Sequence, residues 1–326
     1  MYSHELADNK NNQNNNESDG WLDMSDSLNN DVNGIDMHEI DRSTNVGRLV
    51  GATLDVYEKV AAVADDKGLS RPIVLGSGAM YMNAINSGRY SMSELNRSYA
   101  ERRNFSTTSH GVDIDFGFES EDEVDRLVAM TGNESRRIPV MDSDGQTNMA
   151  DLMSRPPLPG FEPVVIQVGD QEVSLRNPEA AMFGKIKLLN DKPAEQIQQK
   201  WGYDVPMLMS VVDSYRKDNG DLNEYLATRY VDYQKAEIEF KLQQLPKEAY
   251  LSDIVTAQDV RNVLPKADDE MIRRLLGCKV GDISVADFPV EYFNEWNEAY
   301  ASAMDKYRQA NILAAQHDVA SVISDS

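Results

Sequence analysis

The sequence predicts an α+β fold in which a mixed sheet flanked by helices is followed by a helical C-terminal module. Short apolar or alternating runs, typical of strands, fall between residues 72 and 175. Beyond about Pro206 the apolar residues recur at helical spacing. The start of the chain is polar, so we divide the sequence into a disordered, acidic, Asn-rich tail (1–45), a folded core (46–212) and a helical C-terminal domain (213–326).

The tail is expected to be disordered because few of its residues are suited to burial. It contains the stretches NKNNQNNNESDG and SLNNDVNGID, which are rich in Asn and Asp and poor in branched aliphatic residues. Such a segment cannot offset the entropy lost on ordering by removing apolar surface from water.

The first folded elements are predicted to be a helix, a short strand and a second helix. Apolar residues at helical spacing begin at Val46, and the pattern ends near Gly68. Residues 72–75 form a short apolar run that stops at the sequence GSG, and another helical pattern follows. The predicted order is therefore strand, tight glycine turn and helix.

Residues 86–111 form a basic island in an acidic protein. The island carries four arginines against two glutamates: Arg89, Arg97, Arg102 and Arg103. Arginines that face an active-site cleft would clamp the phosphates of a nucleotide or of an RNA acceptor. Alternatively, these arginines pair with the abundant carboxylates of the protein on an exposed insertion.

Apolar and acidic residues then alternate, which predicts a half-buried strand over residues 112–118 with Asp113 and Asp115 on its polar face. A helix is expected to begin near Ser120, followed by strands over 137–141 and 149–153. A hairpin over 164–175 and a helix opened by Pro178 come next. The remainder is predicted to be helical, with breaks near Pro246, Pro265, Gly277 and Pro289.

The glycine turn and the acidic strand together suit phosphoryl chemistry. Glycines let a backbone turn approach a phosphate closely, and the following helix N-terminus presents amides and a partial positive charge. Two carboxylates at positions i and i+2 of a strand project from one face, close enough to hold hard divalent cations between them.

On these residues the chain resembles the DNA polymerase β superfamily of nucleotidyltransferases, whose signature is a Gly-Gly or Gly-Ser turn and a later D-x-D or D-x-E strand. More narrowly, it resembles the AbiEii/AbiGii toxin-like branch, known from abortive-infection and toxin–antitoxin systems. That branch has a Pro-Glu-opened helix with a lysine, and PEAAMFGK places Lys185 seven residues after Pro178. The resemblance covers residues 46–212 and implies a nucleotidyltransferase core.

The resemblance implies four nucleotide-binding residues. Gly76 and Ser77 would contact the nucleotide phosphates. Lys185 would balance the charge of the triphosphate, and Asp204 would match the acid that closes the final motif of the family.

The resemblance also implies a catalytic set of carboxylates that bind magnesium, with two ions expected. Asp113 and Asp115 are its first two members. Asp151, in the context ADLM, is the expected third carboxylate, and Asp142, in the context VMD, is the alternative.

The expected activity is transfer of a nucleoside monophosphate from an NTP to an acceptor, which would be tRNA, a protein or a small molecule. The resemblance places this activity in the toxin of a toxin–antitoxin or abortive-infection system, with an antitoxin protein as partner. The alternative is a catalytically inactive module of the same fold that binds a nucleotide or another protein.

Composition limits the other functions. A net charge of -23 opposes long-range attraction to nucleic acid or to an anionic membrane, although a local basic patch could still bind either. The single cysteine, Cys278, cannot form an intrachain disulfide, and no Cys/His cluster has zinc-site spacing. No signal peptide or membrane-spanning stretch is recognisable, so we expect a cytoplasmic protein.

Overall fold

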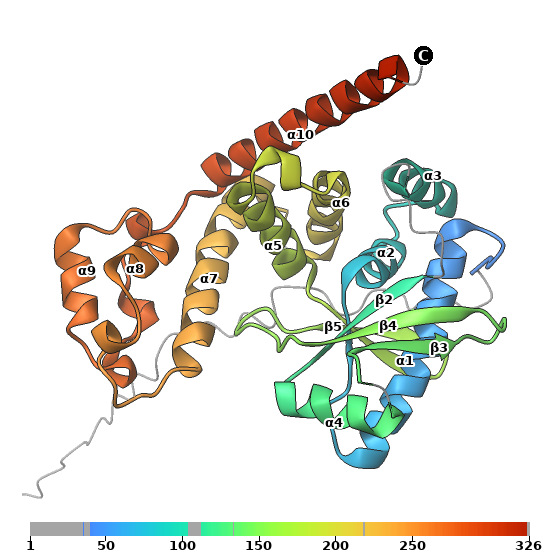
Figure 1. Cartoon of the computed structure of the whole chain (residues 1–326), viewed down its shortest axis with the longest axis horizontal. Helices are drawn as coiled ribbons and strands as arrows, with labels where there is room; N and C mark the ends of the chain where they lie inside the picture. Colours follow the sequence, from blue (N-terminus) through green and yellow to red (C-terminus); the bar gives the residue numbers. More distant parts are fainter. Residues whose placement is uncertain (1–34, 36–39, 104–111, 133, 218, 325–326) are drawn as a thin grey trace, which may run out of the picture.

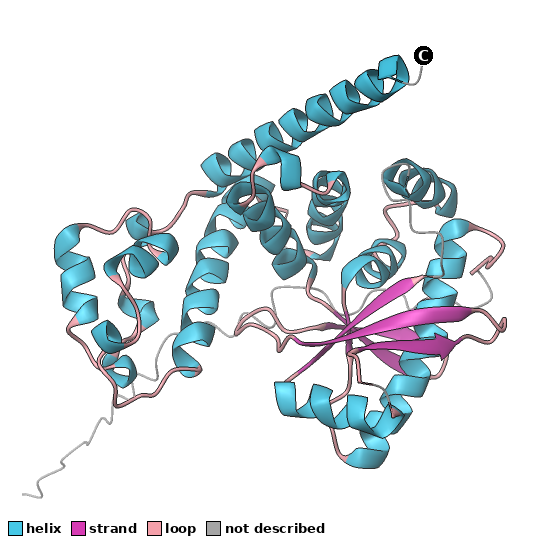
Figure 2. Cartoon of the chain, viewed as in Figure 1, coloured by secondary structure: helices cyan, strands magenta, loops and turns pink. Residues whose placement is uncertain are grey.

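The fold is seen in a computed structural model of the chain, which describes residues 35, 40–103, 112–132, 134–217 and 219–324. One six-stranded sheet lies among helices (Figure 2). The strands follow the order β3-β4-β2-β1-β6-β5 across the sheet and span β1 Ile73–Val74, β2 Asp113–Phe118, β3 Arg137–Met141, β4 Thr147–Ser154, β5 Val164–Val168 and β6 Gln171–Leu175.

The sheet is mixed, which confirms the predicted α+β class. Strand β2 pairs parallel with β4 and antiparallel with β1, while β1 pairs parallel with β6. Both edges of the sheet are hairpins, because β3 returns antiparallel along β4 and β5 along β6. Strand β2 therefore lies inside the sheet with a partner on each side.

Ten α-helices occur within the described residues: α1 Asn45–Lys67, α2 Gly76–Asn86, α3 Met92–Arg103, α4 Glu121–Thr131, α5 Pro178–Asp191, α6 Gln199–Tyr215, α7 Leu222–Gln243, α8 Ala257–Val263, α9 Asp269–Leu276 and α10 Trp296–Ser324. Their ends follow from local chemistry. The Thr44 hydroxyl caps α1 by accepting from the amide of Gly47, and Gly68 ends the helix with φ 63°.

Helix α1 packs on the apolar face of β2. The rings of Tyr57 on α1 and Phe116 on β2 lie 6.3 Å apart. Because side chains alternate along a strand, Asp113 and Asp115 project from the opposite face of β2. Helix α2 follows β1 directly and contacts β2 and β6.

The basic island contains α3, which the sequence analysis did not predict. Leu95 and Tyr99 of α3 are buried, and the helix contacts α1 and α6. The packing of α3 means that this part of the island belongs to the core instead of forming an exposed insertion. The segment 104–111 lies outside the described residues.

The buried apolar residues form two clusters. The larger cluster fills the space around the sheet and includes residues of α1, α2, α5, α6, α7 as far as Ala236 and the first half of α10. The smaller cluster joins the end of α7 to α8, α9 and the loops that follow them. Figure 1 shows α8 and α9 beyond α7, on the side away from the sheet.

Two expected domain limits need correction. The boundary at residue 212 falls inside α6, whose buried Val211, Val212 and Tyr215 all belong to the larger cluster. The expected tail extends too far as well, because Ile35 is buried against β5 and Arg42 makes an ion pair with Asp55 of α1. The rest of that tail, residues 1–34 and 36–39, lies outside the described residues.

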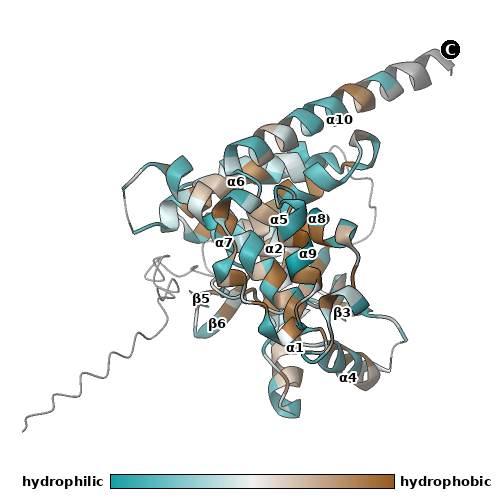
Figure 3. Ribbon diagram, turned by 90° about the vertical axis from the view of Figure 1, so that its left-hand side faces the viewer, coloured by the Kyte–Doolittle hydropathy of each residue, from teal (hydrophilic) through white to brown (hydrophobic). Residues whose placement is uncertain are grey.

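Helix α10 leaves the body of the molecule towards the C-terminus (Figure 1). Its buried residues, such as Ala303 and Ala310, lie on the nearer half. A hydrophobic turn is also visible on the protruding half (Figure 3). Ile312 of α10 is 58% exposed. Within the described residues, no helix has an apolar stretch long enough to cross a bilayer.

Candidate active site

The glycine turn lies directly against the acidic strand. The amide of Leu75, which precedes α2, donates to the main-chain oxygen of Asp115 at 2.8 Å. Gly76 opens α2 with φ 58°, and a Cβ atom placed there would lie 2.1 Å from Oδ2 of Asp115. A side chain at position 76 is therefore excluded both by the left-handed backbone and by the neighbouring carboxylate.

Three carboxylates gather on this part of the sheet. Asp115 and Asp151 are Cα partners on the parallel strands β2 and β4, and Asp113 lies two residues earlier on the same face of β2. We call Asp113, Asp115 and Asp151 the carboxylate cluster. The sheet order brings together the three acids that the sequence analysis selected as catalytic.

The members of the cluster affect one another electrostatically. Burial raises the pKa of Asp115, and the negative charge of Asp151 raises it further. Burial likewise raises the pKa of Asp151, where the negative charge of Asp113 adds to the effect and Arg137 opposes it. Acids that resist ionisation in this way are a common feature of sites that bind cations or transfer protons.

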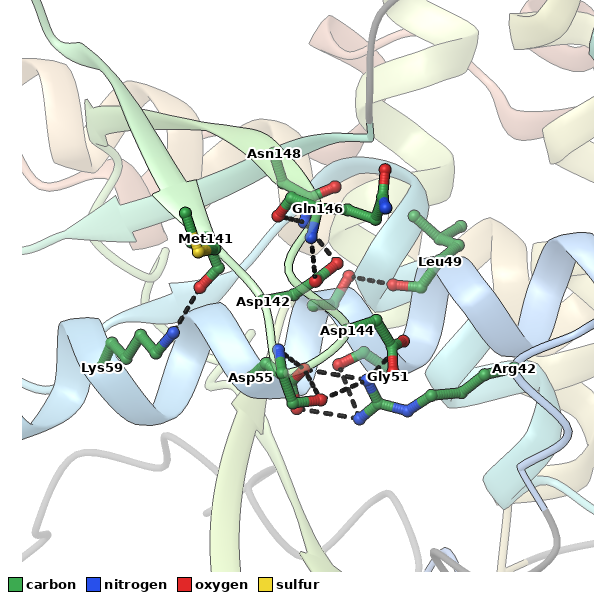
Figure 4. A network of polar contacts seen from close by, with 12 residues as sticks. Arg42, Leu49, Gly51, Asp55, Lys59, Met141, Asp142, Asp144, Gln146 and Asn148 are labelled. Atoms are coloured by element: carbon green, nitrogen blue, oxygen red, sulfur yellow. Dashed lines mark hydrogen bonds and ion pairs between the residues drawn. The ribbon is translucent and has the colours of Figure 1, made fainter.

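Asp142, the alternative third acid, lies elsewhere. Its carboxylate accepts hydrogen bonds from the amide of Gln146 and from Nδ2 of Asn148, both at 2.8 Å, inside the turn between β3 and β4. Figure 4 shows this turn beside α1, where Arg42 and Asp55 form a second network. The structure thus assigns Asp142 to holding the turn, so Asp151 is the better third member.

The donor set suits magnesium, but its arrangement is incomplete. Carboxylate oxygens are the protein ligands that hard divalent cations prefer. The three carboxylates of the cluster share one face of the sheet. However, no group of three or more His, Cys, Asp or Glu side chains in the described part of the chain is arranged to hold a metal ion. Instead, Arg137 of β3 contacts Asp113 at 2.5 Å and Asp151 at 3.6 Å.

A cationic cavity of about 300 Å³ opens beside Gly76. Its lining brings four basic residues together with Gly76, two that directly follow β4 and β6 and two from α5: Arg155, Arg176, Lys185 and Lys187. Lys187 pairs with Glu237 at 2.7 Å, whereas the guanidinium of Arg176 donates to the main-chain oxygen of Ala180 at 3.3 Å. Positive charge thus exceeds negative charge in the lining, which suits an anionic ligand.

Asp204 sits behind this cavity as a buried counter-ion. Its side chain is 1% exposed and accepts hydrogen bonds from Arg102 at 2.7 and 3.1 Å and from Lys185 at 2.5 Å. Arg102 also donates to the hydroxyl of Ser77 at 2.9 Å. Both carboxylate oxygens of Asp204 are thus engaged by internal cations, and this predicted nucleotide-binding residue lies behind the cavity as the partner of Arg102 and Lys185.

The arginines of the basic island differ in their positions. Arg102 is buried and reaches the glycine turn through Ser77, while Arg89 pairs with Asp213 at 3.3 Å on the surface. Arg97 is exposed. Among the arginine side chains of the island that the structure describes, Arg102 of α3 is the one that reaches the candidate site.

Several residues of the site were missed by the sequence analysis. Arg137, Arg155 and Arg176 all lie at or near the cluster and the cavity, on strands or directly after them. Their only signal was a position next to a predicted strand, which many surface arginines share.

Comparisons with protein-family models, with curated proteins and with solved structures found no match to this chain.

Proposed function

We propose that this protein is a magnesium-dependent nucleotidyltransferase, which moves a nucleoside monophosphate from an NTP to an acceptor. The observation that carries the proposal is the contact between the glycine turn and the acidic strand, where position 76 has no room for a side chain beside Asp115. The N-terminus of a helix can bind phosphate through its main-chain amides, and neighbouring carboxylates can bind the metal ions that accompany a triphosphate. Here the two kinds of group lie at one place.

The cluster of Asp113, Asp115 and Asp151 would hold the magnesium ions. When bound, such ions neutralise the charge that develops on the transferring phosphoryl group and activate the attacking oxygen. The residues of the chain hold the reacting groups in position. The main-chain hydrogen bond between Leu75 and Asp115 fixes the strand to the turn, and Gly76 is exposed at the start of α2.

The cationic cavity supports the triphosphate part of the proposal. Its volume of about 300 Å³ is at the lower end of ordinary ligand pockets. Arg155 and Arg176 offer planar guanidinium groups that match phosphate oxygens, and Lys185 adds a point charge that Asp204 holds in place. Arg102 in turn orients the Ser77 hydroxyl beside the turn.

The acceptor would be tRNA, a protein or a small molecule. A net charge of -23 disfavours a long RNA groove, so the proposal favours a narrow site that takes one acceptor end. In a toxin setting, an antitoxin protein would be the natural partner.

The test is transfer from labelled NTPs into total RNA or into a cell lysate, with and without magnesium. Asp113→Asn and Asp115→Asn should each lower the rate more than about 100-fold, because each removes a metal ligand. Asp122→Asn, which removes the same charge from an exposed position on α4, should leave the rate unchanged. Wild-type rates in either cluster variant would refute the assignment.

A second candidate is a catalytically inactive module that binds a nucleotide. The contact of Arg137 with two of the three acids favours it, because that contact satisfies the carboxylates without a metal ion. Thermal melting with each NTP separates the two functions, since a ligand that binds only the native state raises the melting temperature. Stabilisation by NTP without turnover on any acceptor would support the inactive module.

A further inference from the structure

We propose that Arg137 is an internal counter-ion that competes with the divalent cation for Asp113 and Asp151, and so sets the cation concentration at which the carboxylate cluster fills. The inference rests on the proposed metal site. It adds a residue of the chain itself that regulates occupancy of that site.

The position of Arg137 follows from the sheet. Strand β3 is the edge strand beside β4, and Arg137 and Asp151 are Cα partners across that pair (Figure 1). Directly opposite residues of paired strands share one face. The guanidinium therefore lies over the cluster, with Nη2 at 2.5 Å from Oδ1 of Asp113 and Nε at 3.6 Å from Oδ1 of Asp151.

Other basic side chains near the cluster pair with different acids or act on the cluster only through space. Lys185 lies at 2.5 Å from Asp204, and Lys200 influences Asp115 through space. Arg136, the residue before Arg137, projects to the other side of β3 and pairs with Glu121 at 2.5 Å and with Asp125 at 2.7 Å. Arg137 is thus the cation that bridges two members of the cluster.

The guanidinium and a metal ion need the same oxygens. A magnesium or calcium ion takes carboxylate oxygens at about 2.0–2.6 Å, and Oδ1 of Asp113 is already engaged by Arg137. Breaking the contacts of Arg137 costs little free energy, because its side chain is 52% exposed and lies at the edge of the sheet.

The experiment measures Mn²⁺ binding to the full-length protein by electron paramagnetic resonance, with no nucleotide present. Arg137→Gln should tighten Mn²⁺ binding about fivefold, which is the upper range for losing an exposed ion pair of this kind. Arg136→Gln is the matched control, because it removes the same charge one residue away. It should change the dissociation constant less than about twofold.

A second measurement follows Arg137 itself. The Nε–Hε resonance of Arg137, assigned by its loss in Arg137→Gln, should shift when Mg²⁺ is added to the wild type and should stay in place in Asp113→Asn. That result reports on the guanidinium directly and is independent of transfer activity.

The outcomes separate this inference from the proposed function. Equal or weaker Mn²⁺ binding by Arg137→Gln overturns the competition while leaving the metal site intact. Tighter binding without any transfer activity supports the competition and counts against the enzyme. No Mn²⁺ binding by the wild type or by Arg137→Gln up to millimolar concentrations overturns both.

Discussion

Single side chains in this protein hold their buried charges in small networks. Asp204 serves Arg102 and Lys185 at once, and Glu179 is fully buried with Arg229 at 2.7 Å. Removing one partner of such a pair leaves an uncompensated charge in the core, at a typical cost of about 3–5 kcal/mol. The network around Asp204 holds Lys185 in a fixed position in the lining of the candidate phosphate cavity.

At this scale, the acids were predictable and the arginines were not. Asp113 and Asp115 show their shared face through strand alternation alone. The contact of Arg137 with Asp113 depends on β4 lying between β3 and β2, and the order of strands is not visible in a single sequence. Asp142 and Asp151 were likewise indistinguishable until the register placed Asp151 opposite Asp115.

A residue-level prediction concerns Asp55, which joins α1 to the β3–β4 turn (Figure 4). Burial opposes its ionisation, but hydrogen bonds from Arg42 and Ser143 outweigh burial and hold the pKa of Asp55 well below its usual range. The folded pKa is thus lower than the unfolded value of about 3.9, so the stabilisation is complete above that pH and is lost as pH falls through the depressed pKa.

Asp55→Asn should therefore lower the free energy of unfolding by about 2 kcal/mol at pH 7, with a smaller loss at pH 3. Urea denaturation at both pH values measures this difference. Asp144→Asn is the control, because Asp144 contacts the same arginine but is 55% exposed and should cost less than about 0.5 kcal/mol. An equal loss at both pH values would contradict the assigned origin.

Among the elements, the six strands of the sheet were all expected from the sequence, and the helices around them were expected less completely. Helix α3 was missed because its few apolar residues are separated by Arg, Ser and Glu. Helix α6 begins at Gln199, whereas the sequence was expected to become helical only beyond about Pro206. The expected start was too late because proline normally argues against a helix interior, and here Pro206 lies inside α6. Packing against α2 and α5 compensates for that proline.

The start of α2 gives a prediction at this scale. Gly76→Ala should lose about 1–2 kcal/mol from the left-handed backbone and should also displace Asp115, weakening Mn²⁺ binding more than about tenfold. Gly88→Ala is the control, because Gly88 has φ 65° but nothing within 4 Å of an added Cβ. It should cost similar backbone energy and leave Mn²⁺ binding unchanged. Equal Mn²⁺ binding by both variants would show that Gly76 is only a turn residue.

Taken as a whole, the molecule has two hydrophobic clusters joined by one long helix. The first part of α7 belongs to the cluster around the sheet, whereas Ile238 near its end belongs to the cluster with α8 and α9. The sequence predicted a helical C-terminal region and placed its start at residue 213, whereas the change from one cluster to the other falls within α7. The apolar pattern of a single helix does not reveal which of two cores each turn packs against.

This division predicts independent local stability. Leu264→Ala, which truncates a side chain that is 1% exposed in the smaller cluster, should cost about 2–5 kcal/mol and speed hydrogen exchange in α8 and α9. Exchange in β2 and β4, and Mn²⁺ binding, should stay as in the wild type. The matched change Leu208→Ala in the larger cluster should speed exchange in the sheet. Equal acceleration of β2 by Leu264→Ala would mean that the two clusters unfold as one unit.

The ionic triad of Arg102, Lys185 and Asp204 beside the cavity also constrains how this chain can diverge. Arg102 comes from α3, Lys185 from α5 and Asp204 from α6, so three helices meet at one carboxylate. A neutral residue at position 204 would leave two cations without a counter-ion in the interior. In homologous sequences, positions 102, 185 and 204 should therefore change together, and a homologue without the acid should have exchanged both bases for apolar residues.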